Sequence, residues 1–365
     1  MSTRNRRTFI KSLAIAGAGA SALGFTAPSW VPDRRTADKL GIALVGLGYY
    51  SSQLLAPALQ ETSHSYLAGI VTGTPEKAEN WKAKYNIPAK NVYNYENFDE
   101  IAANPDIDII YVVLPNSMHA EYTIRSAKAG KHVICEKPMA SNAEECRAMI
   151  AACNEAGVQL SIGYRMQYEP TTQELIRIGA ERDFGGVRMV TAAAGYREGR
   201  PDTWKLKKAM AGGAMMDMGV YSLQAARYAT GEEPVSVSAQ SFTSRPELYS
   251  EVDETTTFQL TFPSGAIANL QTSHRMGMNT LDVRYQNGWA RLEPFQAYRG
   301  IQGVSSRGSL DYPVVNQQAT QMDEDALSIM EGTAVRVPGE EGLKDMIVVD
   351  AIYASVAQGG STITL

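Results

Sequence analysis

Short apolar runs alternate with helix-like segments through the first half of the chain. The apolar runs lie at 40–45, 67–71, 108–114, 132–135 and 158–162, and the segments with helical spacing lie at 75–85, 97–103, 119–130 and 142–156. Continuous apolar runs of this length are typical of strands buried on both faces. Strands that alternate with helices predict a parallel sheet covered by helices on both sides, so we expect the α/β fold class.

A glycine-rich turn follows the first apolar run. Gly46 and Gly48 stand directly after it, and apolar residues recur at helical spacing from 54 to 59. The first glycine permits a tight turn, and the second lets the backbone approach a pyrophosphate at the start of the helix. Ser51 stands where a third glycine is usual and is small enough to pack there. The match is weak alone, but the repeated strand and helix pattern supports a dinucleotide-binding fold.

The end of the next predicted strand bears on which dinucleotide binds. Proteins that bind NAD usually place Asp or Glu there to hold the ribose hydroxyls. This chain has Thr72 and Thr74, with Lys77 one turn into the following helix. A carboxylate would repel a 2′-phosphate, whereas hydroxyls and an ammonium can bind it, so the sequence favours NADP. The alternative for Lys77 is a solvated helix residue.

Asn116 and His119 follow the run at 108–114, at the edge of the sheet where ligands of such folds bind. Asn116 is predicted either to cap the following helix or to contact the nicotinamide ribose. For His119, a ligand contact and a hydrogen-bonded histidine in the core are equally good interpretations.

Three other residues supply groups suited to proton transfer. Lys137 follows the run at 132–135, and Pro138 keeps it extended, so that its ammonium can point into the crevice. Asp217 and Tyr221 lie four positions apart in the first turns of a predicted helix, hence on one face. A phenol has a pKa of about 10, and a nearby ammonium stabilises its ionised form. The three could move the proton that accompanies a hydride, although a helix charge and a core aromatic are the simpler interpretations of Asp217 and Tyr221.

Length and charge narrow the classes of protein. A chain of 365 residues can form two domains, each with a core of its own. The 34 basic and 39 acidic residues give a formal charge of -5 without a basic stripe, so nucleic acid is not an expected partner.

The three cysteines are predicted to pack in the core. Cys135, Cys146 and Cys153 are odd in number and crowded together, which is not typical of a disulfide framework. On one helix, the last two would be roughly 10 Å apart, beyond disulfide reach. No His or Asp cluster joins them at metal-ligand spacing, so we predict no metal site.

Residues 1–30 have the pattern of an export signal: a basic start, a modest apolar stretch and small residues. Arg6 and Arg7, followed by Phe9 and Lys11, resemble a twin-arginine signal, which exports folded proteins. A folded protein can carry a bound nucleotide, so we expect a periplasmic protein that brings its cofactor along. An uncleaved anchor or a chance basic terminus is the alternative. Residues 31–38 are predicted to form an extended arm.

Several long motifs link the chain to a known family. They are VGLGYYS, LPNSMHAEYTIRSAKAGKHVICEKPMA, IGYRMQYEP, TWKLKKAMAGGAMMDMGVYSLQAARYATGEEP and PGEEGLKDMIVVDAIYASV. Through these motifs the chain resembles the Gfo/Idh/MocA oxidoreductases from the predicted export signal to about residue 360. The resemblance implies that Lys137, Asp217 and Tyr221 line the pocket beside the nicotinamide. Tyr221, where histidine is commoner, points to the glucose-fructose branch of the family.

The resemblance also implies cofactor contacts by Arg165 and Trp204, with Tyr298 as a weaker candidate. The complete set of predicted cofactor-binding residues is Gly46, Leu47, Gly48, Tyr49, Tyr50, Thr72, Thr74, Lys77, Tyr95, Leu114, Asn116, His119, Glu136, Lys137, Arg165, Trp204 and Tyr298.

The implied organisation is a Rossmann NADP-binding domain over 39–162, followed by an α+β substrate and oligomerisation domain over 163–365. The second domain would contain a large open mixed sheet, through whose face a homodimer or homotetramer forms. A late amphipathic helix should pack back on the body through Leu343, Met346, Ile347, Ala351 and Ala354.

The activity implied is a ping-pong exchange between two monosaccharides on tightly bound NADP(H). One aldose is oxidised at C1 to the aldonolactone, and a second sugar is reduced to the alditol. The alternatives are a sugar dehydrogenase that releases its cofactor, an NAD-dependent glycosidase, and a binder without turnover. Export in the folded state argues against the first, and the missing acid after the second strand argues against the glycosidase. No membrane contact is expected after export.

Overall fold

A parallel sheet forms the amino-terminal part of the computed structural model, which describes residues 39–365. Its six strands lie in the order β3-β2-β1-β4-β5-β6. They are β1 (Leu40–Val45), β2 (Ser65–Val71), β3 (Val92–Tyr93), β4 (Ile109–Val112), β5 (His132–Cys135) and β6 (Leu160–Ile162). The predicted α/β class is confirmed. The strand order reverses between β1 and β4, which places a ligand crevice at the carboxyl ends of these strands. The sequence reading missed β3, because two residues make no apolar run.

The helices of this part follow the predicted spacing. They are η1 (Ser51–Leu55), α2 (Ala56–Ala58), α3 (Pro75–Tyr85), η3 (Phe98–Ala103), α4 (His119–Lys128) and α5 (Ala143–Ala156), and the short helices η2 (Ala89–Asn91) and η4 (Asn116–Met118) lie between them. The cap of α5 explains where it begins, because the Asn142 side chain accepts a hydrogen bond from the Glu145 backbone N–H. It ends at Gly157, whose φ of 66° suits a left-handed cap. The segment η3, predicted as helical, is a 3₁₀ helix.

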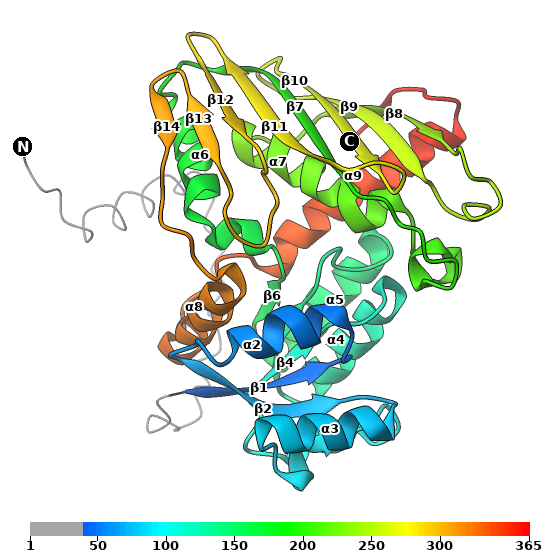
Figure 1. Cartoon of the computed structure of the whole chain (residues 1–365), viewed down its shortest axis with the longest axis vertical. Helices are drawn as coiled ribbons and strands as arrows, with labels where there is room; N and C mark the ends of the chain where they lie inside the picture. The colour runs from blue at the N-terminus through cyan, green and yellow to red at the C-terminus, as the bar shows by residue number, and fades with distance from the viewer. Residues whose placement is uncertain (1–38) are drawn as a thin grey trace, which may run out of the picture. The chain divides into compact units, whose positions relative to one another are not determined.

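A second, mixed sheet lies above the first in Figure 1. Its nine strands follow the order β14-β13-β12-β11-β7-β10-β9-β8-β15, and β10 and β7 are its parallel pair. The strands are β7 (Val187–Gly195), β8 (Ser236–Phe242), β9 (Thr255–Thr261), β10 (Ile267–Ser273), β11 (Met278–Tyr285), β12 (Trp289–Leu292), β13 (Gly303–Ser305), β14 (Gly308–Leu310) and β15 (Ile363–Thr364). This sheet confirms the large open mixed sheet that was expected.

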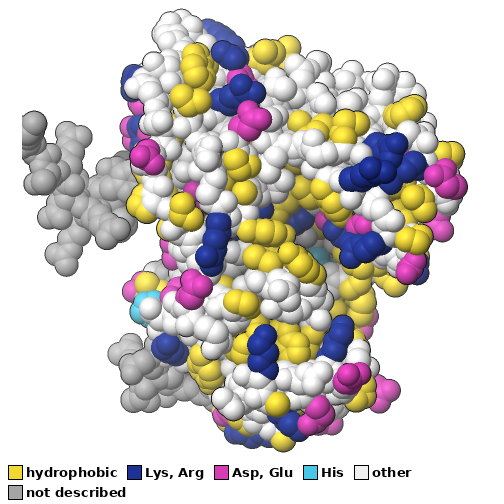
Figure 2. Space-filling model, in the orientation of Figure 1, with side chains coloured by type: hydrophobic (Ala, Val, Ile, Leu, Met, Phe, Trp, Pro, Cys, Tyr) yellow, Lys and Arg dark blue, Asp and Glu magenta, His cyan; other side chains and the backbone are white. Residues whose placement is uncertain are grey.

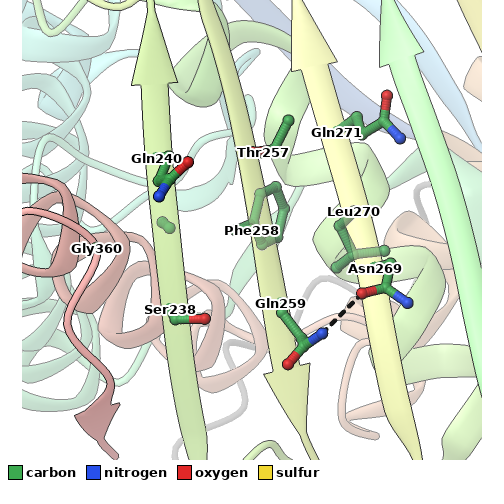
Figure 3. A pocket seen from close by; sticks show the side chains of 10 residues that line it. Ser238, Gln240, Thr257, Phe258, Gln259, Asn269, Leu270, Gln271 and Gly360 are labelled. Atoms are coloured by element: carbon green, nitrogen blue, oxygen red, sulfur yellow. Dashed lines mark hydrogen bonds between the residues drawn. The ribbon is translucent and has the colours of Figure 1, made fainter.

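One face of the second sheet is covered and the other is open. The helices α6 (Pro170–Glu181), α7 (Val220–Thr230) and α9 (Gly339–Ala357) pack on the covered side (Figure 1). The strands alternate accordingly: along β9, Phe258 and Leu260 point into the core, while Thr257 and Gln259 are exposed. A shallow pocket on the open face is lined mainly by Ser, Thr, Gln and Asn side chains (Figure 3).

Of the two carboxyl-terminal helices, α9 contacts elements of both sheets. Helix α8 (Gln317–Glu331) packs against β2 and η1 of the first sheet, and α9 packs against α5 and β8. The predicted contact face of α9 is partly wrong. Met346 and Ala351 are buried as expected, but Ile347 is exposed and Ala354 is half-buried. The buried side of the helix also includes the polar Asp345, which pairs with Arg227.

The described residues belong to one compact unit, and the predicted division into 39–162 and 163–365 remains a prediction. Backbone hydrogen bonds cross the expected boundary, as from Ile162 N–H to Val337 C=O at 2.9 Å.

The predicted export signal at 1–30 and extended arm at 31–38 lie outside the described residues. Among residues 39–365, no helix combines the length and the apolar character needed to cross a bilayer.

The three cysteines are buried and free, in agreement with a packing role. Cys146 and Cys153 lie on the inner face of α5. Burial raises the pKa of each of these two thiols to about 12, so neither is a reactive thiolate at neutral pH.

Asp325 on α8 gives the fold a testable pH dependence. Its side chain is fully buried and accepts a hydrogen bond from Tyr168 Oη at 2.9 Å. Burial raises its pKa from 3.8 to about 7. The folded state therefore binds the proton more tightly than the unfolded state, and this contribution to the free energy of unfolding is lost as pH rises from about 4 to 7.

We expect Asp325→Asn to remove this fall of the free energy of unfolding with rising pH, because the asparagine amide is neutral at every pH. Relative to the unmodified protein, the variant should gain up to about 4 kcal/mol between pH 4 and pH 8, as measured by urea unfolding. Asp323→Asn, on the same helix but only half-buried, is the control and should show no such gain. Parallel pH curves for Asp325→Asn and the unmodified protein would contradict the expectation.

Candidate functional site

The glycine turn after β1 has the geometry that a pyrophosphate site needs. Gly46 has a φ of 91°, and a Cβ there would lie 2.4 Å from Val113 O, so only glycine fits. A Cβ on Gly48 would meet nothing within 4 Å, which leaves its outer side open. Ser51 is fully buried, and its hydroxyl donates to Gly46 O at 2.5 Å. The hydroxyl thus ties the helix to the turn, which a third glycine would do by close packing.

The end of β2 carries hydroxyls and an ammonium, without a carboxylate from Val71 to Thr74. Thr72 is buried, and its Oγ1 accepts a hydrogen bond from Thr74 N at 3.3 Å. Lys77 Nζ lies 3.5 Å from Leu47 O, so this exposed side chain reaches back to the glycine turn.

The Tyr95 ring closes the same region. A Cβ on Gly73 would lie 3.1 Å from this ring, which in turn packs edge-on against Tyr122 with centroids 5.5 Å apart.

Asn116 and His119 have structural partners. The Asn116 side chain donates to Ala211 O at 2.8 Å and does not cap the following helix, so the capping prediction is wrong. Its amide instead joins the first sheet to the segment before the π-helix at 215–219. His119 is buried, with Nδ1 2.8 Å from Pro138 O and Nε2 2.9 Å from Leu114 O. This is the core histidine of the two interpretations, and burial lowers its pKa.

Glu136 points into the protein. Its Oε1 accepts a hydrogen bond from Tyr111 Oη at 2.7 Å, and its Oε2 faces the Lys137 backbone N–H at 3.3 Å. Burial raises the pKa of Glu136, although Tyr111 and Lys137 oppose the shift. A Cβ on Gly163 would lie 2.7 Å from Glu136 Oε1, so this carboxyl is tightly enclosed.

Lys137 brings the three predicted catalytic residues together. It follows β5 at the carboxyl edge of the first sheet, and its Nζ donates to the Asp217 backbone carbonyl at 2.7 Å. The same nitrogen lies 3.9 Å from Asp217 Oδ1 and 4.5 Å from the centroid of the Tyr221 ring. The ammonium therefore lies over the face of the tyrosine, where the ring quadrupole attracts a cation.

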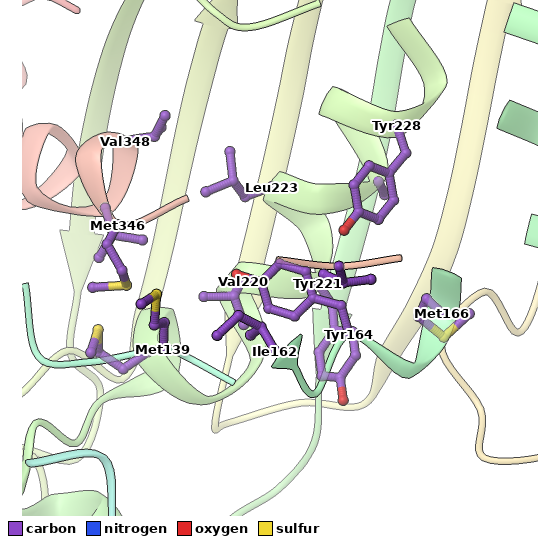
Figure 4. Close-up of a cluster of buried hydrophobic side chains, with 14 of the residues drawn as sticks. Met139, Ile162, Tyr164, Met166, Val220, Tyr221, Leu223, Tyr228, Met346 and Val348 are labelled. Atoms are coloured by element: carbon purple, nitrogen blue, oxygen red, sulfur yellow. The ribbon is translucent and has the colours of Figure 1, made fainter. Parts of the chain in front are cut away.

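A second cation, the Arg165 guanidinium, also lies over the Tyr221 ring. The Arg165 guanidinium carbon lies 5.2 Å from the Tyr221 centroid and 4.6 Å from the Tyr298 centroid, so Arg165 contacts both rings. Arg165 is buried and donates to Ala297 O at 2.9 Å and to the Gln317 side chain. Figure 4 shows Tyr221 among buried apolar side chains. Two cations thus lie against the Tyr221 ring, where its quadrupole attracts positive charge.

Asp217 lies on a wider helical turn than was expected, and Tyr221 lies in the α-helix that follows it. The predicted first turns of one α-helix are a π-helix, η8 (Met215–Gly219), which continues into α7. Helix α7 is capped by Gly231. A π-turn inside a helix re-aims the side chains that it carries and is frequent at functional sites.

Asp217 is held ionised by groups that the sequence reading missed. Its Oδ2 lies 2.7 Å from Lys205 Nζ, 3.0 Å from His274 Nε2 and 3.0 Å from Tyr196 Oη. Burial by itself would raise the pKa of Asp217, but Lys205, His274 and Lys137 outweigh it and hold the pKa well below its usual range. Tyr196 and His274 directly follow Gly195 and Ser273, which are paired in register on the parallel strands β7 and β10.

A hollow appears in the middle of the face shown in Figure 2, where apolar, basic and histidine side chains meet. The remaining predicted cofactor residues differ in exposure. Tyr49 is 71 % exposed, Trp204 in η6 (Trp204–Leu206) is half-buried, and Leu114 is buried. The Tyr50 and Tyr298 rings lie 5.9 Å apart, which joins the glycine turn to the loop after β12. The cofactor contacts of all these residues stay predictions.

Known proteins share this architecture over nearly the whole chain. A domain described as "Oxidoreductase family, NAD-binding Rossmann fold" matches residues 40–164, and a GFO/IDH/MocA C-terminal domain matches residues 172–291. The solved structure of an aldose-aldose oxidoreductase from Caulobacter crescentus, in complex with glycerol, is 43% identical with a TM-score of 0.86. It aligns over 90% of this chain and 100% of its own.

Two curated relatives are more distant in sequence. The D-xylose 1-dehydrogenase [NADP(+)] of Haloarcula marismortui is 27% identical, covering 94% of this chain and 98% of its own. The D-xylose 1-dehydrogenase (NADP(+)) 2 of Haloferax volcanii is 28% identical, covering 88% and 97%. With both of its domains matched and the glycine turn, lysine and tyrosine in place, the chain belongs to the GFO/IDH/MocA oxidoreductase family.

Proposed function

We propose that the protein is a periplasmic sugar oxidoreductase that keeps one NADP(H) bound and passes a hydride from one monosaccharide to another. The observation that carries this proposal is the position of Tyr221, which has Lys137 and Arg165 over its ring beside the nucleotide edge of the first sheet. The Caulobacter relative, an aldose-aldose oxidoreductase, supports sugar-to-sugar transfer, and the haloarchaeal relatives support NADP as the cofactor.

The residues of the glycine turn and of β2 fit NADP. The open side of Gly48 gives room for the pyrophosphate at the start of the following helix. Thr72, Thr74 and Lys77 provide hydroxyls and a positive charge for a 2′-phosphate, and the end of β2 has no carboxylate to repel it. Bound NADP would supply the hydride acceptor for the first sugar and, once reduced, the hydride donor for the second.

Side chains of the protein accept and return the proton that accompanies each hydride transfer. Tyr221 takes the proton from the anomeric hydroxyl as C1 is oxidised, and Lys137 favours the ionised phenol through its charge 4.5 Å from the ring centroid. Tyr221 then returns the proton to the carbonyl oxygen of the second sugar. Asp217 is held as a carboxylate, and its Oδ1 is the oxygen that remains available to orient a sugar hydroxyl.

The experiment that tests the proposal is the analysis of nucleotide retained by the purified protein. The exported protein is purified without added nucleotide and denatured, and the released molecule is identified by mass and absorbance. We expect NADP(H) at one per chain. NAD would favour the glycosidase, and an empty protein would favour a dehydrogenase with exchangeable cofactor or a binder.

A second arm tests the sugar-to-sugar cycle. The dialysed protein is incubated with pairs of aldoses, without added nucleotide, and the products are analysed. Lactone and alditol should appear in equal amounts, and turnover that requires added NADP would contradict the closed cycle.

A further inference from the structure

Two ammonium groups face the single carboxylate of Asp217. Lys205 Nζ lies 2.7 Å from Oδ2, whereas Lys137 Nζ lies 3.9 Å from Oδ1. His274 Nε2 and Tyr196 Oη each lie 3.0 Å from Oδ2, so this oxygen is crowded with donors from the second sheet. The closer ion pair of Asp217 is thus with Lys205.

Lys137 is bound differently. Its Nζ makes its short contact, 2.7 Å, with the neutral backbone carbonyl of Asp217 and lies over the Tyr221 ring. Attraction between opposite charges strengthens as their separation and the local dielectric fall, and this site is largely buried. A carboxylate that lacked Lys205 would therefore draw Lys137 into a direct ion pair and away from Tyr221.

We propose that Lys205 is a positioning residue, which pairs with the Asp217 carboxylate so that the Lys137 ammonium stays over Tyr221. The proposal rests on the proposed role of Tyr221 as proton acceptor. His274 is completely buried and, with Tyr196, fixes the orientation of the same carboxylate oxygen.

The other charges near these groups do not replace Lys205. Arg165 faces Tyr221 from the side of Tyr298 and is held by backbone carbonyls. Beyond Tyr196, Glu198 lies 3.2 Å from its hydroxyl and pairs with Arg200. Side-chain hydrogen bonds from Arg200 lower the pKa of Glu198 to about 2, so Glu198 is a carboxylate whose own cation is Arg200.

The test follows the ionisation of the Tyr221 phenol by ultraviolet absorbance, which needs no sugar turnover. The phenolate signal of each protein is taken as the difference from its own Tyr221→Phe counterpart. In Lys205→Met we expect the Tyr221 phenolate to form about one pH unit higher than in the unmodified protein. The acid limb of the kcat profile should move with it, which lowers the rate at neutral pH roughly tenfold.

Three further variants separate positioning from a loss of structure. Lys205→Arg keeps the charge and should restore the phenolate titration. In Lys205→Met with Asp217→Asn, no carboxylate competes for Lys137, so the midpoint should return toward that of the unmodified protein even though the rate stays low. Lys207→Met makes the same change on an exposed lysine nearby and should leave both profiles unmoved.

Some outcomes would overturn the proposal. One is an unchanged phenolate titration in Lys205→Met, and another is a shift that Asp217→Asn does not reverse. If Lys205→Met does not fold, Lys205→Gln takes its place under the same criteria. Because the titration is independent of sugars, failure of the sugar-to-sugar cycle and failure of this proposal give different results.

Discussion

Replacement of Tyr221 by Phe is expected to lower sugar turnover by about 10²- to 10⁴-fold, the usual contribution of a positioned acid or base. The substitution removes the hydroxyl and keeps the ring on which Lys137 and Arg165 lie. The packing around the ring is therefore retained, and the nucleotide should stay bound in the same amount. The measurement is the rate of lactone formation, together with the nucleotide released per chain.

Tyr228→Phe is the matched control. Tyr228 lies on the same helix as Tyr221, two turns further on, is similarly buried, and its hydroxyl has no hydrogen-bond partner among the described residues. Loss of this hydroxyl should leave the turnover rate within about twofold of that of the unmodified protein, because no hydrogen bond is broken. Equal rates for Tyr221→Phe and the unmodified protein would rule out Tyr221 as the proton acceptor.

Replacement of Arg227 by Met is expected to lower the free energy of unfolding by about 3–5 kcal/mol. Arg227 is buried on α7 and pairs with Asp345 at 2.5 Å, Glu233 at 2.6 Å and Glu341 at 3.0 Å. Asp345 is completely buried on α9, so the variant leaves its charge without a cation. Gln224, the other hydrogen-bond partner of Asp345, is neutral.

The loss should depend on pH. Burial raises the pKa of Asp345, and Arg227 opposes that shift, so removal of Arg227 raises the pKa further. A raised pKa in the folded state means that stability falls as pH increases, and the deficit of Arg227→Met should be larger at pH 8 than at pH 5. Addition of Asp345→Asn should recover part of the loss at pH 8, because the buried charge is gone.

Arg177→Met is the control for this prediction. Arg177 on α6 also has three carboxylate partners, Glu174, Glu181 and Asp183, but its side chain is 26% exposed. Water can solvate the partners that remain, so its loss should cost only about 1 kcal/mol or less. Urea unfolding at both pH values measures both variants. Similar losses of unfolding free energy for Arg227→Met and Arg177→Met would contradict the expectation that the cost depends on burial.

Local sequence patterns predicted most of the first sheet. Five of its six strands and the glycine turn follow from apolar runs and glycine spacing, and α3 begins and ends where its pattern predicted. These features depend on neighbours along the chain, which a sequence shows directly. The pattern was misleading for α9, whose buried side includes the ion-paired Asp345 while Ile347 is exposed.

The candidate site could be predicted only in part. Lys137 was recognisable by its place after a strand, and Asp217 and Tyr221 by their spacing and by resemblance to a family. Lys205, Tyr196 and His274 carry no shared local signal, because they come from three separate segments. They meet at Asp217 because β7 and β10 are parallel neighbours, which places the residues after both strands at one edge.

Resemblance to a family pointed to the lysine and tyrosine proposed for catalysis. The sequence alone established the α/β class, the glycine turn that suits a dinucleotide, and the lack of a carboxylate after β2. Each of these depends on residue type at a known spacing. Tertiary structure decided which groups share the charge of Asp217, how Lys137 lies over Tyr221, and that His119 belongs to the core. The reason is physical: hydrogen bonds, ion pairs and burial depend on distances in space, and these distances exist only after the two sheets have packed together.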